Sequence, residues 1–325
     1  MDSTRSFFWN TEQKRLRAVW RILLQIILLF PTLGILSMPA IIFGDIYPFS
    51  AFSTVAESVS GEIAFIVSIW LAGRWLDKRR FTDFGLHFSA HWGRQFSFGL
   101  FLGAALMTGI FLVEKMLGYV TISETLHVAE PSLSFWQAIW LPLFIFISVG
   151  FAEELFSRGY HLRNMAEGFH FGRISPKLAI LLALILSSSI FGIAHASNPN
   201  ATFVSSFNIA IAGIFLGLGL ILLDELAIPI GLHITWNFFQ GNVFGFPVSG
   251  KSTIGGTFLK IEQSGPVWFT GGAFGPEAGV IGLIAMGIGM VAIVLYARWE
   301  RGSAEIDPTI AIYQPPPPNS LIKNL

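Results

Sequence analysis

The chain has 325 residues, no cysteine and a formal net charge of zero; 53% of its residues are hydrophobic and only 12% are charged. Soluble domains carry about 25% charged residues, so this composition predicts a polytopic membrane protein. Without cysteine, disulfides and thiolate metal sites are excluded, and the balanced charge gives no indication of a nucleic acid or an acidic partner.

Apolar segments long enough to cross a bilayer recur along the whole chain. A transmembrane helix needs about 20 predominantly apolar residues, and about eight segments meet this requirement. They are residues 19–43, 57–74, 96–117, 135–155, 178–197, 203–223, 227–243 and 277–297. The sequence therefore predicts an all-α fold, a polytopic membrane helix bundle of about eight transmembrane helices.

Lysine and arginine are divided unevenly between the two sides that alternating spans define. Of the 20 Lys and Arg residues, only Lys115, Lys251 and Lys260 lie on one side, and the other seventeen lie on the side of the two termini. Basic residues are enriched in cytoplasmic loops, so we expect both termini in the cytoplasm and the protein in the cell membrane. The turn at 224–225, which carries no basic residue, is the weakest part of this assignment.

A pair of glutamates, Glu153 and Glu154, closes the fourth apolar segment, with Arg158 one helical turn later. A charge at the centre of a membrane helix costs about 2.5–3.5 kcal/mol, so a functional site is the default hypothesis for such a cluster. The spacing of four predicts an ion pair between Glu154 and Arg158. Glu153 lies about 100° around the helix, which leaves it the freer carboxylate, able to take a proton from water. The alternative is a solvated helix end with a simple salt bridge.

Two further polar pairs lie on later apolar segments. Phe191 and His195 are four residues apart near the end of the fifth segment, and His233 and Asn237 have the same spacing in the seventh. Side chains four apart share one helix face, so His233 and Asn237 could both donate to one developing negative charge. Taken singly, His195 could be an interfacial hydrogen bonder, and the seventh-segment pair a polar contact between helices.

The three elements together, on separate segments and in this order, resemble one family. It is the CAAX-protease and bacteriocin-processing family of intramembrane endopeptidases, also called the CPBP or Abi family, which is related to the type II CAAX prenyl endopeptidase. The resemblance covers residues 135–243, and residues 265–277 also resemble a stretch of many bacterial members. It implies hydrolysis of peptide bonds in lipidated, CAAX-like or other membrane-associated proteins or small peptides, which would enter from the lipid or the cytoplasmic side.

The resemblance and the chemistry of the side chains together predict individual roles. Glu153 and His195 would position and deprotonate a water, and His233 and Asn237 would stabilise the oxyanion of the tetrahedral intermediate. The expected catalytic residues are Glu153, Glu154, His195, His233 and Asn237, supported by Arg158 and Phe191.

The sequence leaves open whether a metal takes part. Glu153, Glu154, His195 and His233 could supply ligands to zinc or another divalent cation, and the family is often labelled a metalloprotease family. The chain lacks the His-Glu-x-x-His spacing that presents two imidazoles to one ion, and the four candidates lie on three segments. We favour a metal-independent glutamate mechanism.

The segment Gly245-Phe-Pro-Val-Ser-Gly-Lys-Ser252 matches the letters of a phosphate-binding loop. A working loop of this kind follows a strand and opens a helix, whereas here an apolar span precedes it and Pro247 lies inside it. We therefore expect no nucleotide as a partner, and the expected partners are a peptide or protein substrate and the lipid bilayer.

For seven other ionisable residues we expect positions outside the catalytic site. Solvated positions are expected for His87, His91, His127, His161 and His170, and interfacial positions for Glu62 and Glu114. Simple depth counting places Glu153 and His195 near opposite ends of their segments. They could meet if the fourth helix continues to about Arg163 and residues 168–176 form a hairpin beyond it.

Four parts of the chain follow from this reading. Residues 1–130 form N-terminal transmembrane helices, 131–245 the catalytic helices, 246–276 an extracytoplasmic loop, and 277–325 the last transmembrane helix and a cytoplasmic tail. Two alternatives to a protease stay open: a non-catalytic immunity or scaffold protein of the same fold, and an ion or solute carrier. The lack of a visible internal repeat counts against a carrier built from inverted repeats.

Overall fold

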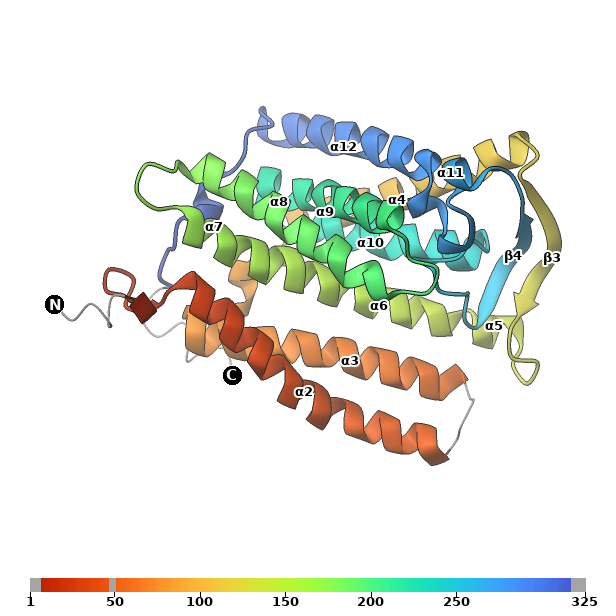
Figure 1. Cartoon of the computed structure of the whole chain (residues 1–325), viewed down its shortest axis with the longest axis horizontal. Helices are drawn as coiled ribbons and strands as arrows, with labels where there is room; N and C mark the ends of the chain where they lie inside the picture. Colours follow the sequence, from red (N-terminus) through yellow and green to blue (C-terminus); the bar gives the residue numbers. More distant parts are fainter. Residues whose placement is uncertain (1–6, 47–50, 317–325) are drawn as a thin grey trace.

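The computed structural model describes residues 7–46 and 51–316. Long helices lie side by side in one bundle (Figure 1), and within the described residues seven of them are long and apolar enough to cross a membrane. They are built from α2 (Ala18–Ile46), α3 (Ala51–Ala72), α4 (Ala90–Met116), α6 (Trp140–Glu154), α8 (Pro176–Ala194), α9 (Phe203–Leu223) and α12 (Val280–Arg301). The chain is a multi-pass membrane protein with the predicted all-α architecture.

Shorter elements cap and connect these helices. Helical pieces are α5 (Phe135–Ala138), α7 (Arg163–Phe169), α10 (Ala227–Phe238), α11 (Val267–Thr270) and the π-helical turns η1 (Gly73–Asp77), η3 (Leu155–Leu162) and η5 (Phe239–Val243). The 3₁₀ turns are η2 (Phe81–Phe84), η4 (His195–Ser197), η6 (Gly272–Phe274), η7 (Pro276–Ala278) and η8 (Pro308–Ala311). Strands β1 (Trp9–Asn10) and β2 (Arg15–Leu16) form a small hairpin before α2.

The fourth helix is longer than its apolar segment. A run of 35 residues, Phe135–Phe169, is helical from α5 through α6 and η3 to α7. The condition under which Glu153 and His195 could meet, a fourth helix that continues to about Arg163, is therefore met, and residues 170–175 connect this helix to α8. The π-helical turn η3 begins directly after Glu154; such turns inside α-helices are frequent at functional sites. Glu153 consequently lies near the middle of the long helix and not at its end.

The seventh predicted segment, residues 227–243, folds differently from a lipid-facing span. It consists of α10 continued by η5, and nearly all of α10 is buried among the other helices. It is too short to count among the seven long apolar helices. Its enclosure explains why a segment with a histidine and an asparagine is stable at this depth: other helices, and not lipid, surround those groups.

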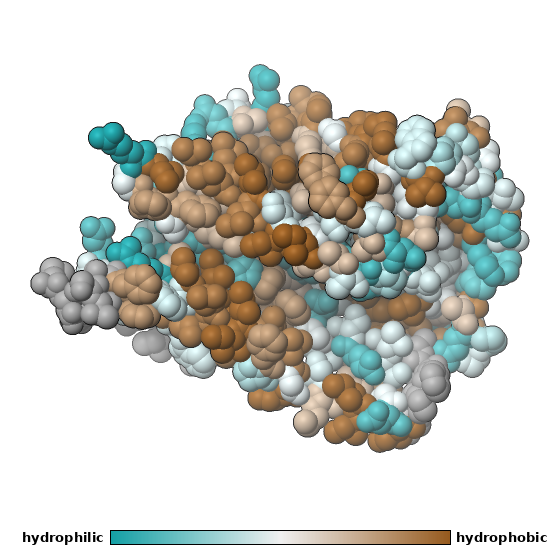
Figure 2. Space-filling view, in the orientation of Figure 1, coloured by the Kyte–Doolittle hydropathy of each residue, from teal (hydrophilic) through white to brown (hydrophobic). Residues whose placement is uncertain are grey.

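A two-stranded ribbon that the sequence reading did not foresee covers one end of the bundle. Strand β3 (Val120–Val128) pairs antiparallel with β4 (Gly256–Gln263), at the right of Figure 1. Glu114, expected at the membrane interface, is instead buried and accepts a hydrogen bond from Gln263 at 2.7 Å. Figure 2 shows apolar side chains over the flanks of α2, α8 and α12, and polar ones gathered at the ribbon end.

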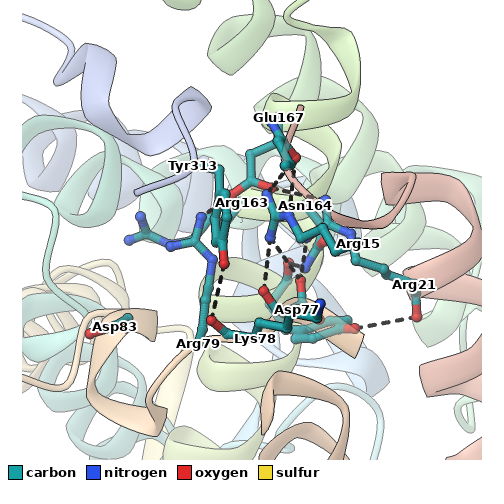
Figure 3. A network of polar contacts seen from close by, with 12 residues as sticks. Arg15, Arg21, Asp77, Lys78, Arg79, Asp83, Arg163, Asn164, Glu167 and Tyr313 are labelled. Carbon is teal, nitrogen blue, oxygen red and sulfur yellow. Dashed lines mark hydrogen bonds and ion pairs between the residues drawn. The ribbon is translucent and has the colours of Figure 1, made fainter. Parts of the chain in front are cut away.

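Five charged side chains close the opposite end of the bundle (Figure 3). Glu167 of α7 accepts hydrogen bonds from Arg15 at 2.5 Å, from Arg21 at 2.9 Å and from Arg79. Arg21 also bonds Asp77 at 2.6 Å, and all five side chains are buried. Because removing one partner would leave uncompensated charge in a poor dielectric, this cluster fixes β2, the start of α2 and the end of η1 against the end of α7.

Glycines allow α10 to lie directly against α4. A Cβ added at Gly99 or Gly103 of α4 would overlap backbone atoms of α10, and one at Gly231 of α10 would overlap the backbone of α4. Small residues at such crossings let membrane helices approach closely, where dispersion contacts drive association. This contact sets the position of α10, and hence of His233 and Asn237.

We predict opposite effects of the same substitution at two glycines of α4. Gly103→Ala should destabilise the protein by about 1–3 kcal/mol because the added methyl overpacks the contact with α10. The matched control Gly109→Ala meets open space, so it should stabilise by up to about 1 kcal/mol through helix propensity. Thermal unfolding in detergent measures both, and equal melting temperatures for the two variants would contradict the packing argument.

Candidate active site

The carboxylate of Glu154 joins two helices. Its Oε1 accepts hydrogen bonds from Arg158 Nη1 and from His233 Nδ1, both at 2.8 Å. Arg158 in turn donates to the Gly213 carbonyl at 3.2 Å and stacks 4.3 Å from the centroid of the Phe191 ring. The predicted ion pair between Glu154 and Arg158 is therefore confirmed, and it is buried. The spacing along the chain does not predict the bond to His233, through which this carboxylate also orients α10.

Polar side chains from three helices line a common cavity of about 320 Å³. Glu153 comes from α6, His195 from the end of α8, and both His233 and Asn237 come from α10. The continued fourth helix therefore brings the glutamate and His195 to the same space despite their different places in the sequence. These are the four residues that the sequence reading assigned to water activation and oxyanion stabilisation.

Hydrogen bonds place a proton on Nδ1 of both cavity histidines. His195 Nδ1 lies 2.8 Å from the Phe191 carbonyl oxygen, which can only accept, so Nδ1 carries the proton and Nε2 is the acceptor. His233 Nδ1 donates to the Glu154 carboxylate, and only the imidazolium form of this ring would also donate through Nε2.

Glu153 differs from its neighbour in its bonding, because Glu154 Oε1 accepts two hydrogen bonds from side chains. Within residues 7–46 and 51–316, Oε2 of each of the two glutamates is buried and has no hydrogen-bond partner. A buried carboxylate oxygen without a protein partner is rare, and a functional role or a bound water is a common explanation. The expectation that Glu154 is held while Glu153 is the freer carboxylate agrees with these contacts.

The cavity has two charged lining residues that the sequence reading did not assign to the site. Glu62 of α3, expected at the interface, lines the same cavity as Glu153. Lys251 lies on the loop after η5 and is exposed at its edge. The sequence contained a signal for Glu62, because an ionisable residue inside a span is a functional-site hypothesis by default. It did not show which other residues share the cavity with Glu62.

The segment 245–252 that imitates a phosphate-binding loop covers this cavity. It closes a tight turn through a bridge between Val248 and Lys251, and β4 follows it where a nucleotide-binding loop has a helix. The backbone at Ser249 and Gly250 has φ values of 46° and 82°, so the turn depends on left-handed conformations that favour glycine. The residues that match the phosphate-binding motif therefore form a tight turn.

Glu277 anchors that turn from behind the site. Its carboxylate accepts hydrogen bonds from Gln240 Nε2 at 2.7 Å and from Ser249 Oγ at 3.1 Å. It also borders a small space shared with His195 and Asn237. Burial raises the pKa of Glu277 to about 7, although these hydrogen bonds oppose the rise.

A second, mostly apolar groove of about 330 Å³ joins the site from the flank of the bundle. It shares Glu153, His195 and Lys251 with the cavity and runs along α8 to Met165 of α7. His161 lines it and is buried, 7% exposed, which corrects the expectation of a solvated role. The reason is that η3 and α7 extend the fourth helix, so residues after the acidic pair remain inside the bundle.

The candidate donors do not form a metal site as folded. Glu154 Oε1 is already engaged by Arg158 and His233. Within the described part of the chain, no group of three or more His, Asp or Glu side chains is placed to hold an ion. Structural zinc sites take four ligands and catalytic ones three with a water, so this arrangement does not fit a resident metal.

Comparisons with known proteins agree with the predicted resemblance. Residues 135–239 match the family model described as type II CAAX prenyl endopeptidase Rce1-like. The uncharacterized protein YyaK of Bacillus subtilis is 28% identical over 212 residues, which cover 62% of this chain and 65% of that protein, just under two thirds of its length. No solved structure matches the chain significantly. The family match includes all seven residues predicted for the site, from Glu153 to Asn237.

We predict that Glu277 makes stability depend on pH. Its pKa is raised in the folded protein, so folding favours the protonated form and stability falls as pH rises from about 4.5 to about 7. Glu277→Gln, which imitates the protonated form, should remove this loss. The measurement is the melting temperature of both proteins across that range, with the exposed Glu262→Gln as the control. Parallel profiles for wild type and Glu277→Gln would count against the assignment.

Proposed function

We propose that this chain, Rce1-like over residues 135–239, is an intramembrane endopeptidase that hydrolyses peptide bonds of membrane-associated or lipidated proteins or of small peptides. One observation carries the proposal: Glu153, His195, His233 and Asn237, from three different helices, line a single cavity. A base, a proton acceptor and two hydrogen-bond donors around one space are the parts that peptide hydrolysis requires.

Glu153 would act as the general base. Its unpartnered carboxylate oxygen would hold a water, and His195, whose Nε2 is an acceptor, would bind the same water from the other side. The water oxygen attacks the peptide carbonyl carbon while its proton passes to the carboxylate. The same group then returns that proton to the leaving amine as the carbon–nitrogen bond breaks.

His233 and Asn237 would bind the oxygen of the tetrahedral intermediate. Both lie on the cavity face of α10, where preorganised donors are worth more than in water because the site is shielded from solvent. Glu154 would keep His233 oriented without touching the substrate, and Arg158 would hold the Glu154 carboxylate in place. The sequence reading gave Glu154 only the role of holding Glu153 in place. In this proposal it also orients His233, one of the two groups that would donate to the oxyanion.

The apolar groove along α8 suits the membrane-embedded part of a substrate. It reaches the base at one end and the lipid-facing flank of the bundle along its length, where Ile26 and Ile190 are exposed. An apolar segment or lipid chain lying there would present the adjoining peptide bond to Glu153. Burial of apolar surface would supply binding free energy at about 25 cal/mol per Å².

Two substitutions test the proposed roles. We expect Glu153→Gln to lower the cleavage rate by about 10²–10⁴ through loss of the base, and Asn237→Ala by about 10²–10³ through loss of one oxyanion donor. The exposed Glu305→Gln serves as the matched control.

The measurement compares membrane peptides from cells that produce wild type or Glu153→Gln, followed by cleavage of the peptides that differ by purified protein. Normal cleavage by Glu153→Gln would contradict the assignment of Glu153 as the general base of a protease. A scaffold would tolerate the glutamine, and a carrier would instead give proton- or ion-dependent flux in liposomes.

We predict that chelators leave the activity intact. The donor set does not fit a resident metal, so 1,10-phenanthroline or EDTA should not change the rate of the purified enzyme, and metal analysis should find less than one equivalent of zinc. Loss of activity that returns with added zinc would show that the donors rearrange around an ion and would overturn the glutamate mechanism.

A further inference from the structure

The cavity that holds Glu153 has its polar rim at one end of the bundle. Thr54 at the start of α3, and Lys251 and Ser252 on the loop before β4, line it and are exposed. The first half of α6 lines its wall from Pro142 onward. This is the end at which the β3–β4 ribbon lies, at the right of Figure 1. The rim offers the Ser252 hydroxyl and the Lys251 ammonium group, which suit a polar peptide.

The catalytic cavity does not extend to the other end of the bundle, where a separate pocket of about 340 Å³, bordered by Arg79 and Asp224, shares no lining residue with it. Beyond Glu154, the helix carries Leu155, Tyr160 and Leu162 with no exposed surface. Farther along lies the buried charged cluster around Glu167, on which the Tyr313 ring packs at 3.4 Å from the Arg15 guanidinium (Figure 3). A peptide approaching from this end would have to separate several buried ion pairs, each expensive to break.

Basic residues distinguish the two ends. At the end opposite the rim, the start of α2, the turn between α7 and α8 and the end of α12 lie together (Figure 1). Exposed or half-buried lysines and arginines there include Lys14, Arg17, Lys78, Arg80, Arg94, Arg173, Lys177, Arg298 and Arg301. The rim end has Lys115, Lys251 and Lys260, with acidic Glu124, Glu130 and Glu262 beside them. An excess of Lys and Arg marks the cytoplasmic side.

We propose that the catalytic cavity opens to the non-cytoplasmic side of the membrane. Its substrate is then a membrane-anchored peptide whose polar segment lies outside the cytoplasm and enters between Thr54 and Ser252. The substrate class rests on the proposed protease function; the side of the opening does not. The family resemblance implies entry from the lipid or the cytoplasmic side, and this opening lies opposite to the second of these.

The natural absence of cysteine makes the side of the opening directly measurable. Ser252→Cys places a thiol at the rim, and Ser303→Cys places one just after α12 at the opposite end; both positions are exposed. We expect a membrane-impermeant maleimide to label Ser252→Cys in right-side-out vesicles and Ser303→Cys only in inside-out vesicles. The reverse pattern, or labelling of both thiols from one side, would overturn the proposal.

A second readout separates the route from the activity. Cleavage of a membrane peptide identified by the Glu153→Gln comparison is followed in right-side-out vesicles before and after maleimide treatment. If maleimide treatment stops cleavage by Ser252→Cys and leaves cleavage by Ser303→Cys unchanged, the result supports entry through the rim. Unchanged cleavage in fully labelled Ser252→Cys overturns that route and leaves the protease standing. Absence of cleavage in unmodified wild type refutes the protease function and, with it, the substrate class, while the labelling still decides the side.

Discussion

The arrangement of the site depends on one buried carboxylate. Glu154 accepts hydrogen bonds from Arg158 on its own helix and from His233 on α10. A carboxylate at this depth is tolerable only with such partners, since an uncompensated buried charge costs several kcal/mol. The same requirement that neutralises Glu154 therefore draws α10 against α6. Because α10 also carries Asn237, satisfying one charge positions both donors at the cavity.

Backbone elements around Glu154 also hold the site residues in position. The π-helical turn η3 follows Glu154 and is buried along nearly its whole length, and glycines let α4 press α10 from the other side. Rigid supporting elements of this kind hold catalytic groups within the small tolerances that chemistry demands. The turn at Ser249, bonded to Glu277, closes the remaining side. The cavity is thus bounded by elements far apart in the chain.

The helical class, the order of the spans and the ion pair between Glu154 and Arg158 could all be predicted, because hydropathy and a spacing of four are local properties. The cavity partners Glu62 and Lys251 could not, since α3 and the loop after η5 reach the site only through packing. The burial of His161 was missed for a related reason: the fourth helix continues beyond its apolar stretch, and only neighbouring helices reveal that its later residues are enclosed. The strands β3 and β4 pair across more than 100 residues of intervening chain, a distance at which short-range pattern carries little information.

By itself, the sequence determined that this is a multi-pass helical membrane protein with three polar elements on separate spans, since the low charge content and long apolar runs admit few other solutions. It also determined the side that carries the basic residues. The tertiary structure decided which polar groups share a cavity, that Glu154 bonds His233 as well as Arg158, and at which end the cavity has its rim. Those outcomes depend on how helices pack against each other, and packing is set by contacts between residues that no spacing along the chain relates.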